Sequence, residues 1–87
     1  MRILFSHKFV KRFSKIPLTL QDQFHDRLAL FQSNVRSPVL RDHALIGEWI
    51  GCRSINITGD FRALYREVAM DTFEFVAIGT HHELFGT

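Results

Sequence analysis

The first third of the chain alternates apolar and polar residues in patterns that predict a short strand followed by helices. Residues 1–5 are mostly apolar, as expected of a short strand. Over residues 7–16, apolar side chains recur every three or four positions, the spacing of a helix with one buried face. Ser6 can cap the first turn of this helix through its hydroxyl. Pro17 is expected to end it, because proline offers no amide hydrogen and restrains the residue before it.

A second helix is predicted over residues 20–33. Its apolar face consists of Leu20, Phe24, Leu28 and Phe31. Thr19 and Asp22 resemble a capping box at its start, although Glu or Gln is the usual second member, and Asn34 suits its end. Two helices that are joined by a few residues are expected to pack as an antiparallel hairpin.

The second half of the chain predicts strands. After a loop over residues 35–48, three runs of strand type follow at residues 49–58, 61–68 and 73–80, with turn sequences between them. In the first run, Ile55 and Ile57 alternate with polar residues, so that one face of the strand is apolar and the other polar. Residues 81–85 are expected to form one helical turn that Gly86 ends.

The element order β-α-α-β-β-β is typical of an α+β sandwich. We expect a twisted, mainly antiparallel sheet with the helical hairpin on one face and the other face open. A chain of 87 residues has room for one domain, so residues 1–87 are predicted to form a single domain.

Charged residues are distributed unevenly along the chain, and this distribution bears on which partners the protein could bind. Eight of the 11 Lys and Arg residues lie in the first 41 residues, whereas seven of the nine Asp and Glu residues come later. Four of the basic residues share a face of the first predicted helix: Lys8, Lys11, Arg12 and Lys15. This imbalance favours an anionic partner, most commonly nucleic acid. Charge alone is equally consistent with lysines that merely keep a helix soluble.

Composition also limits the function. The single Cys52 excludes an internal disulfide framework and a cysteine-based zinc cluster, and suits a reducing cytoplasm. No apolar run approaches the ~20 residues that span a bilayer, so we expect a cytoplasmic protein with no membrane partner. No phosphate-binding glycine loop, nucleophile elbow or metal-ligand spacing is present, and no cofactor or metal is expected.

A set of polar and aromatic residues in the second half is suited to breaking RNA. It comprises Arg41, His43, Arg53, Asn56, Asp60, Arg62 and His81, with Phe61 and Phe85 close by in sequence. RNA carries its own nucleophile, the 2′-hydroxyl. Histidine can transfer protons near neutral pH, arginine binds phosphate oxygens in pairs, and phenylalanine can stack on a base. Each residue taken singly also has an ordinary structural explanation, such as a turn for Asp60 or an ion pair for Arg53.

Three segments of this region resemble the toxins of the RelE/ParE superfamily, and most closely its YafQ-like branch. They are Asp42-His43-x-Leu45-x-Gly47 continuing to Trp49-x-Gly51-x-Arg53, then Gly59-Asp60-Phe61-Arg62-x-x-Tyr65, then Gly79-Thr80-His81-x-x-Leu84-Phe85. The resemblance covers essentially the whole chain, because those toxins also run strand, helical hairpin and three-stranded meander. It implies a RelE-like sandwich and a toxin of a type II toxin–antitoxin pair.

The YafQ-like branch implies an mRNA interferase, an endoribonuclease that cuts messages in the ribosome. By this resemblance, His43 and His81 are implicated in proton transfer, Asp60 and Phe85 complete the catalytic set, and Arg62 holds the scissile phosphate. Partners would be a cognate antitoxin, the ribosome and mRNA, with DNA contacted only through the antitoxin. Arg41, Arg53, Asn56 and Phe61 are expected to contact RNA near the site. Gly79, beside His81 on the same face, is expected to leave space for a nucleotide. The basic residues of the first helix are expected to grip ribosomal RNA away from the site.

Two residues depart from the branch. Asn56 stands where a histidine is usual and cannot shuttle a proton, and Phe61 replaces a tryptophan. Two alternatives therefore stay open: a ParE-type toxin that binds DNA gyrase without cutting, and a degenerate homologue that only binds its antitoxin. Clustered acid and base residues count against the gyrase alternative.

Overall fold

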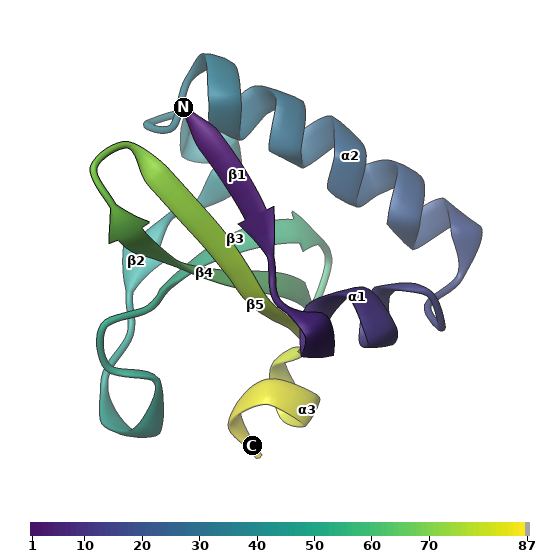
Figure 1. Ribbon diagram of the computed structural model, residues 1–87. Helices are drawn as coiled ribbons and strands as arrows, with labels where there is room; N and C mark the ends of the chain where they lie inside the picture. Colours follow the sequence, from purple (N-terminus) through teal and green to yellow (C-terminus); the bar gives the residue numbers. More distant parts are fainter. Residues whose placement is uncertain (87) are drawn as a thin grey trace.

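The computed structural model describes residues 1–86, which form a five-stranded sheet with helices on both faces (Figure 1). The strands are β1 (Arg2–Phe5), β2 (His43–Ala44), β3 (Arg53–Thr58), β4 (Phe61–Ala69) and β5 (Thr72–Thr80), and the helices are α1 (His7–Phe13), α2 (Leu18–Ser33) and α3 (His81–Phe85), with 3-10 turns η1 (Pro38–Leu40) and η2 (Gly47–Trp49). The sheet order is β1-β5-β4-β3-β2. β1 pairs with β5 in parallel, and the other neighbours are antiparallel. The predicted α+β class and mainly antiparallel sheet are confirmed.

The helical hairpin forms as predicted, but its boundaries and one cap differ. Ser6 caps α1 by accepting from the Phe9 amide at 3.1 Å. The helix ends at Phe13 rather than at residue 16, because the chain tightens into a turn before Pro17. The predicted capping box is wrong: α2 begins directly after Pro17, and no side chain caps it. Instead, Gln21 donates to the carbonyl oxygens of residues 13 and 16, which satisfies the end of α1.

The predicted strand over residues 49–58 begins only at Arg53. Gly47 and Gly51 adopt left-handed backbone conformations, with φ of 70° and 91°, that turn the chain around η2. Trp49 therefore lies in a loop rather than in the sheet. Cys52 is partly buried in the same loop, just before β3.

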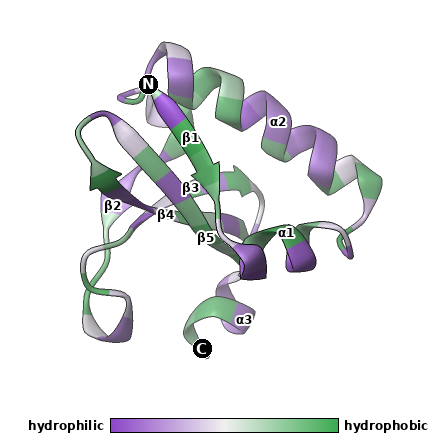
Figure 2. Ribbon diagram, in the orientation of Figure 1, coloured by the Kyte–Doolittle hydropathy of each residue, from purple (hydrophilic) through white to green (hydrophobic). Residues whose placement is uncertain are grey.

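The core lies between the sheet and the α1–α2 hairpin, on what we call the core face of the sheet. Hydrophobic and hydrophilic residues alternate along α2 and the central strands (Figure 2). The buried side chains include Phe9, Phe24, Phe31, Phe75, Ile55, Ile57, Ala63 and Tyr65. Four phenylalanines pack with ring centroids 5.3–6.0 Å apart, at the tilted and edge-on angles that aromatic pairs prefer. This aromatic cluster is what holds the hairpin on the sheet.

The opposite face of the sheet, here the α3 face, is not fully open as predicted. Figure 1 shows α3 and the η2 loop below the sheet, on the side away from α2. Trp49 in that loop donates its indole N–H to the Leu84 carbonyl oxygen of α3 at 3.0 Å. Ser54 and Leu64, which pair on this face, are fully buried. Polar residues therefore stay accessible only toward one end of the α3 face.

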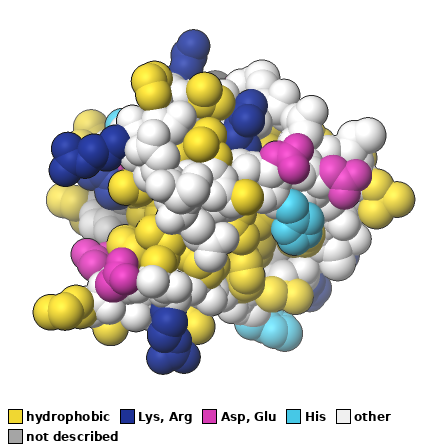
Figure 3. All heavy atoms as spheres, turned by 90° about the horizontal axis from the view of Figure 1, so that it is seen from above, with side chains coloured by type: hydrophobic (Ala, Val, Ile, Leu, Met, Phe, Trp, Pro, Cys, Tyr) yellow, Lys and Arg dark blue, Asp and Glu magenta, His cyan; other side chains and the backbone are white. Residues whose placement is uncertain are grey.

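Hydrophobic side chains also reach the surface near the hairpin, as the view from above shows (Figure 3). Phe5, Val10 and Leu18 are all exposed, and a hollow of about 120 Å³ lies beside the aromatic cluster. In the described part of the chain, no helix has the length and apolar character needed to cross a membrane.

Candidate active site

Four residues predicted for the site line one hollow of about 210 Å³: Arg41, His43, Asn56 and Arg62. The strand register explains why they meet. His43 of β2 pairs with Ser54 of β3, and Asn56 of β3 pairs with Arg62 of β4. Paired residues project from the same face of a sheet, and so do residues two apart along one strand. Three strands therefore bring these side chains together on the α3 face.

The Arg62 guanidinium is half-buried, and two oxygens hold it. Its Nη1 donates to the side-chain oxygen of Asn56 and to the Gly59 carbonyl oxygen, the latter at 3.3 Å. Among residues 1–86, no carboxylate forms an ion pair with Arg62. The N–H groups that these two oxygens leave unused can bind two oxygens of a phosphate, the paired geometry that arginine favours.

His43 is exposed, and a backbone oxygen orients its ring. Its Nδ1 lies 2.9 Å from the Arg41 carbonyl oxygen. A carbonyl oxygen only accepts hydrogen bonds, so Nδ1 carries the hydrogen in this contact. Nε2 then holds the lone pair when the ring is neutral, and His43 can take up a proton there.

His81 lies at the start of α3, beside the turn between β3 and β4. Its backbone N–H donates to the Asp60 carbonyl oxygen at 3.0 Å, and its ring packs edge-on against Phe85 at 4.9 Å between centroids. A capping box fixes this end of the helix: the Thr80 hydroxyl accepts from the Glu83 amide at 3.1 Å, and the Glu83 carboxylate accepts from the Thr80 amide at 2.8 Å. The Asp60 side chain is exposed at the turn.

Gly79 does not leave space for a nucleotide, contrary to the sequence-based expectation. It pairs with Arg62 and is buried, but a side chain added there would meet Glu83 at 3.1 Å and Leu84 at 3.6 Å. The absence of a side chain at Gly79 thus lets α3 pack against the sheet. Any nucleotide must bind farther along the α3 face, where Arg62 and His43 are accessible.

Two expected RNA contacts lie elsewhere. Phe61 is only 8% exposed and belongs to the core, so it offers no surface on which a base can stack. Its position on β4 alternates with Arg62, which places it on the core face. Arg53 alternates with Asn56 in the same way and forms an ion pair with Asp42, from Nε to a carboxylate oxygen at 2.7 Å. The sequence places these residues near Arg62 along the chain, but strand alternation separates them in space.

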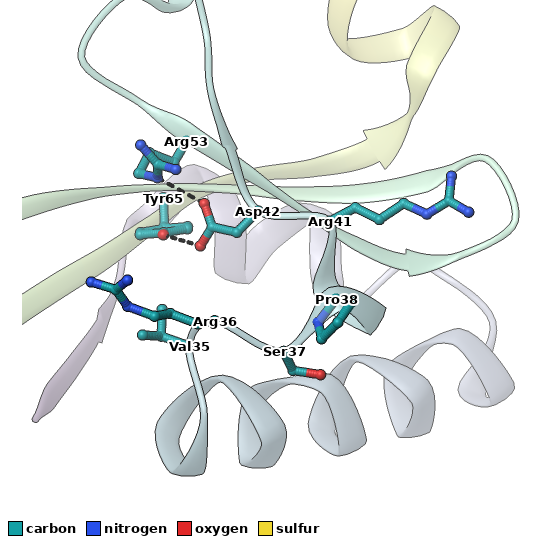
Figure 4. A pocket seen from close by; sticks show the side chains of 8 residues that line it. All are labelled: Val35, Arg36, Ser37, Pro38, Arg41, Asp42, Arg53 and Tyr65. Carbon is teal, nitrogen blue, oxygen red and sulfur yellow. Dashed lines mark hydrogen bonds and ion pairs between the residues drawn. The ribbon is translucent and has the colours of Figure 1, made fainter.

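Asp42 and Tyr65 are two residues of this region to which sequence reasoning assigned no role. Both lie with Arg36, Arg41 and Arg53 at a second hollow, of about 430 Å³ (Figure 4). The Asp42 carboxylate accepts from Arg53 and from the Tyr65 hydroxyl. Burial and this hydrogen bond raise the pKa of Tyr65 well above its usual value. Both residues belong to the motifs quoted above, but a sequence motif does not show which of its members touch.

The basic residues of the first helix lie closer to α3 than expected. Lys8, Lys11, Arg12 and Lys15 line a shallow hollow of about 240 Å³. Lys15 follows the end of α1, and Arg12 forms an ion pair with Glu83 of α3. Hydrogen bonding from the Thr80 backbone and then from Arg12 lowers the pKa of Glu83. The basic residues of the first helix were expected to lie away from the α3 face. For Arg12 this expectation is wrong, because its side chain contacts α3.

Residues 1–86 contain no group of three or more His, Cys, Asp and Glu side chains arranged to hold a metal ion.

Comparison with known proteins gives this geometry a context. Residues 2–86 match the profile of the family described as "Bacterial toxin of type II toxin-antitoxin system, YafQ". The chain belongs to the YafQ toxin family. A Haemophilus influenzae protein that carries the YafQ name is 47% identical over 34 residues, which are 39% of this chain and 33% of that protein. The chain thus matches about a third of the length of this curated relative.

Solved structures extend the likeness to the whole YafQ fold. YafQ from Escherichia coli strain BL21(DE3) is 25% identical, with a TM-score of 0.79 over 99% of this chain and 100% of that one. YafQ in the Escherichia coli DinJ–YafQ complex has the same fold, with a TM-score of 0.73 and 24% identity over 99% of this chain and 100% of that one. The YafQ family match includes every candidate residue from Lys8 to Phe85.

Proposed function

We propose that this chain is a ribosome-dependent endoribonuclease that cuts mRNA and that a cognate antitoxin restrains it. One observation carries the proposal: three strands bring His43, Asn56 and Arg62 to a single hollow on the accessible part of the α3 face. His43 can serve as the base and Arg62 as the phosphate-binding cation that RNA cleavage by the 2′-hydroxyl uses, and the Asn56 amide can hydrogen-bond to the phosphate. Membership of a toxin family agrees with this chemistry.

In the proposed reaction, the chain supplies the proton transfers and the RNA supplies the nucleophile. Nε2 of His43 takes the 2′-hydroxyl proton, and the 2′-oxygen attacks the adjacent phosphorus. The bond from phosphorus to the 5′-oxygen of the next nucleotide breaks, and His81 gives that oxygen a proton. The products are a 2′,3′-cyclic phosphate and a 5′-hydroxyl, with no atom drawn from a metal or cofactor.

The remaining residues stabilise the negative charge of the transition state and position the reacting groups. Arg62 offsets the negative charge that builds on the phosphate, a contribution that typically changes rates by ~10²–10³. Asn56 orients Arg62 through its side-chain oxygen and can donate its NH₂ group to the phosphate. Asp60 holds the start of α3 through its carbonyl oxygen, and Phe85 packs on the His81 ring. Arg41 lines the same hollow, where its guanidinium is suited to bind a neighbouring phosphate of the RNA.

The antitoxin is proposed by analogy with the Escherichia coli complex of YafQ with DinJ. A protein that acts on ribosomes and messages would work in the cytoplasm. DNA would be contacted only through the antitoxin.

Expression of the chain without its antitoxin tests the function. Growth should stop because translation is arrested, and messages should be cut within their reading frames to leave 2′,3′-cyclic phosphate and 5′-hydroxyl ends. Mapping of the message ends in extracts measures this, with an Arg62→Ala strain as the control. Growth arrest with intact messages and a DNA-damage response would favour the gyrase-binding alternative. If a strain that makes the folded protein grows normally, the result would favour a homologue that only binds its antitoxin.

A further inference from the structure

The Asp42 carboxylate ties the loop before β2 to the middle of the sheet. Its side chain is 11% exposed, and its two oxygens accept from different strands. Nε of Arg53 on β3 donates to one oxygen at 2.7 Å, and the Tyr65 hydroxyl on β4 donates to the other. Figure 4 shows the Asp42 carboxylate beside these two side chains, joined to each by a dashed line, while Arg41 extends in the opposite direction. A single carboxylate thus links the loop to two strands.

Leu40 anchors the chain before Asp42 in the core, whereas the strand after Asp42 is weakly held. β2 is two residues long and lies at the edge of the sheet. Arg41, the residue before Asp42, ends η1 with a φ of 48°, in the left-handed region that a residue with a side chain adopts at a cost in free energy. Its N–H donates to the Pro38 carbonyl oxygen at 3.2 Å, which is one contact that holds it. Such a conformation persists only where surrounding contacts hold it. The contacts of Asp42, the next residue, are suited to hold it.

The orientation of His43 depends on the same peptide group. The Arg41 carbonyl oxygen belongs to the peptide plane that joins Arg41 to Asp42, and this oxygen receives the Nδ1 hydrogen of His43. Fixing the Asp42 side chain therefore fixes the plane whose oxygen selects the His43 tautomer. Without that plane, the neutral ring is free to place its hydrogen on either nitrogen.

We propose that Asp42, Arg53 and Tyr65 form a positioning network that keeps the His43 hydrogen on Nδ1 and Nε2 free to accept a proton. The catalytic part of this inference rests on the proposed function, whereas the tautomer part does not. None of the three side chains lines the hollow that contains Arg62. They are positioning residues, which act through the Arg41 carbonyl oxygen.

Electrostatics keep the network intact at neutral pH. Burial and the bond to Asp42 raise the pKa of Tyr65, so its hydroxyl stays protonated and continues to donate. The hydrogen bond from Arg53 to Asp42 raises the pKa of the Arg53 guanidinium. Both partners of the carboxylate are thus constant hydrogen-bond donors.

The test compares folded variants by their His43 tautomer and by their kinetics. Asp42→Asn and Tyr65→Phe alter the network with little change of shape, and Arg53→Gln alters it at a side chain that is 48% exposed, where folding is not at risk. Arg66→Gln is the matched control, since Arg66 forms an exposed ion pair with Glu74 and not with Asp42. Nitrogen-15 shifts of the imidazole report the tautomer, and His43→Gln identifies the signals. Cleavage of mRNA on programmed ribosomes gives kcat and KM.

The expected results are specific to positioning. Wild type and Arg66→Gln should show the Nδ1-protonated ring, whereas the network variants should show a mixture of tautomers. Their kcat should fall, by up to about 100-fold, with little change in KM, because misplacement of a reacting group affects the chemical step. Folded network variants that keep the Nδ1 tautomer would overturn the inference, and so would a shifted tautomer with unchanged kcat in an active enzyme. If wild type cuts no message but the tautomer shifts as expected, the proposed function fails and the positioning network stands.

Discussion

Single residues on the α3 face depend on their neighbours for orientation. The Arg62 side chain is held by the side-chain oxygen of Asn56 and by a turn carbonyl, so a residue that cannot transfer protons still has a use in the site. This contact gives Asn56 a structural role that does not depend on proton transfer. It also separates the expected effects of replacing Arg62 and Asn56.

Replacing Arg62 by alanine should lower message cleavage by ~10²–10³, the usual effect of removing a group that stabilises charge in the transition state. His81→Ala should lower it by ~10²–10⁴, as expected for a lost general acid. Asn56→Ala should cost less, because the guanidinium remains but is held less firmly. Message cleavage and growth arrest measure these effects.

Arg66→Ala provides the control for Arg62→Ala, because it removes the same group from the same strand at an exposed position. Circular dichroism and antitoxin binding verify that each variant is folded. Wild-type growth arrest by folded His81→Ala would contradict the assignment.

Among the elements, α3 is the one whose packing decides the shape of the α3 face. Five residues make it too short to be stable alone, so its capping box, its contact with Trp49 and its ion pair with α1 hold it in place. Glu83 takes part in the first and the last of these contacts. The position of His81 therefore depends on one carboxylate.

The stability of the protein should have a component that follows the ionisation of Glu83. Its folded pKa is lowered, so the charged form favours folding. This stabilisation is present above the pKa of an unfolded glutamate, about 4.3, and is lost as the pH falls through the lower folded value. Glu83→Gln keeps a capping residue but removes the charge. Thermal unfolding should show wild type more stable than Glu83→Gln at pH 7, with a difference that shrinks toward pH 3.

The effect should be modest because the Glu83 side chain is 44% exposed. Glu48→Gln, at an exposed glutamate for which residues 1–86 offer no ion-pair partner, controls for the loss of one carboxylate. An equal stability difference from pH 7 to pH 3 would contradict this role of Glu83.

Across the whole molecule, the basic surface of α1 and the α3 face are adjacent through the Arg12–Glu83 pair. Lys8, Lys11 and Lys15 are the members of this surface that are exposed and for which residues 1–86 provide no ion pair. A long polyanion such as ribosomal RNA is the partner that such a surface fits. Arg12 has a structural contact to α3 and is best left in place when this is tested.

Changing Lys8, Lys11 and Lys15 together to glutamine should weaken ribosome binding and make it less sensitive to salt, because fewer counterions are released. Sedimentation with ribosomes over a range of salt concentrations measures this. Changing Arg2, Arg36 and Arg66 to glutamine removes the same charge from other parts of the surface and should have a smaller effect. Equal binding by the lysine variant and wild type would mean that these lysines only keep the helix soluble.

The sequence alone determined the main elements and their order, but it predicted only a loop where the two-residue strand β2 lies. Helices and strands follow from spacings of a few residues, and Ser6, Asn34 and Gly86 mark helix boundaries by local backbone chemistry. Alternation along β3 and β4 already implies which residues share a face. His43, Asn56 and Arg62, predicted together for the site, do line one hollow.

Only the tertiary structure decided which side chains touch. Arg12 and Glu83 are 71 positions apart, and Asp42 and Tyr65 are 23 apart, so their contacts depend on strand register and on how α3 folds back. Phe61 and Arg53 were misplaced because proximity along a strand does not give the face. Gly79 was misinterpreted because the space beside it is filled by a helix that follows it in the chain. Local periodicity depends on residues that are close together in the sequence, whereas long-range contacts form only when the whole core has packed.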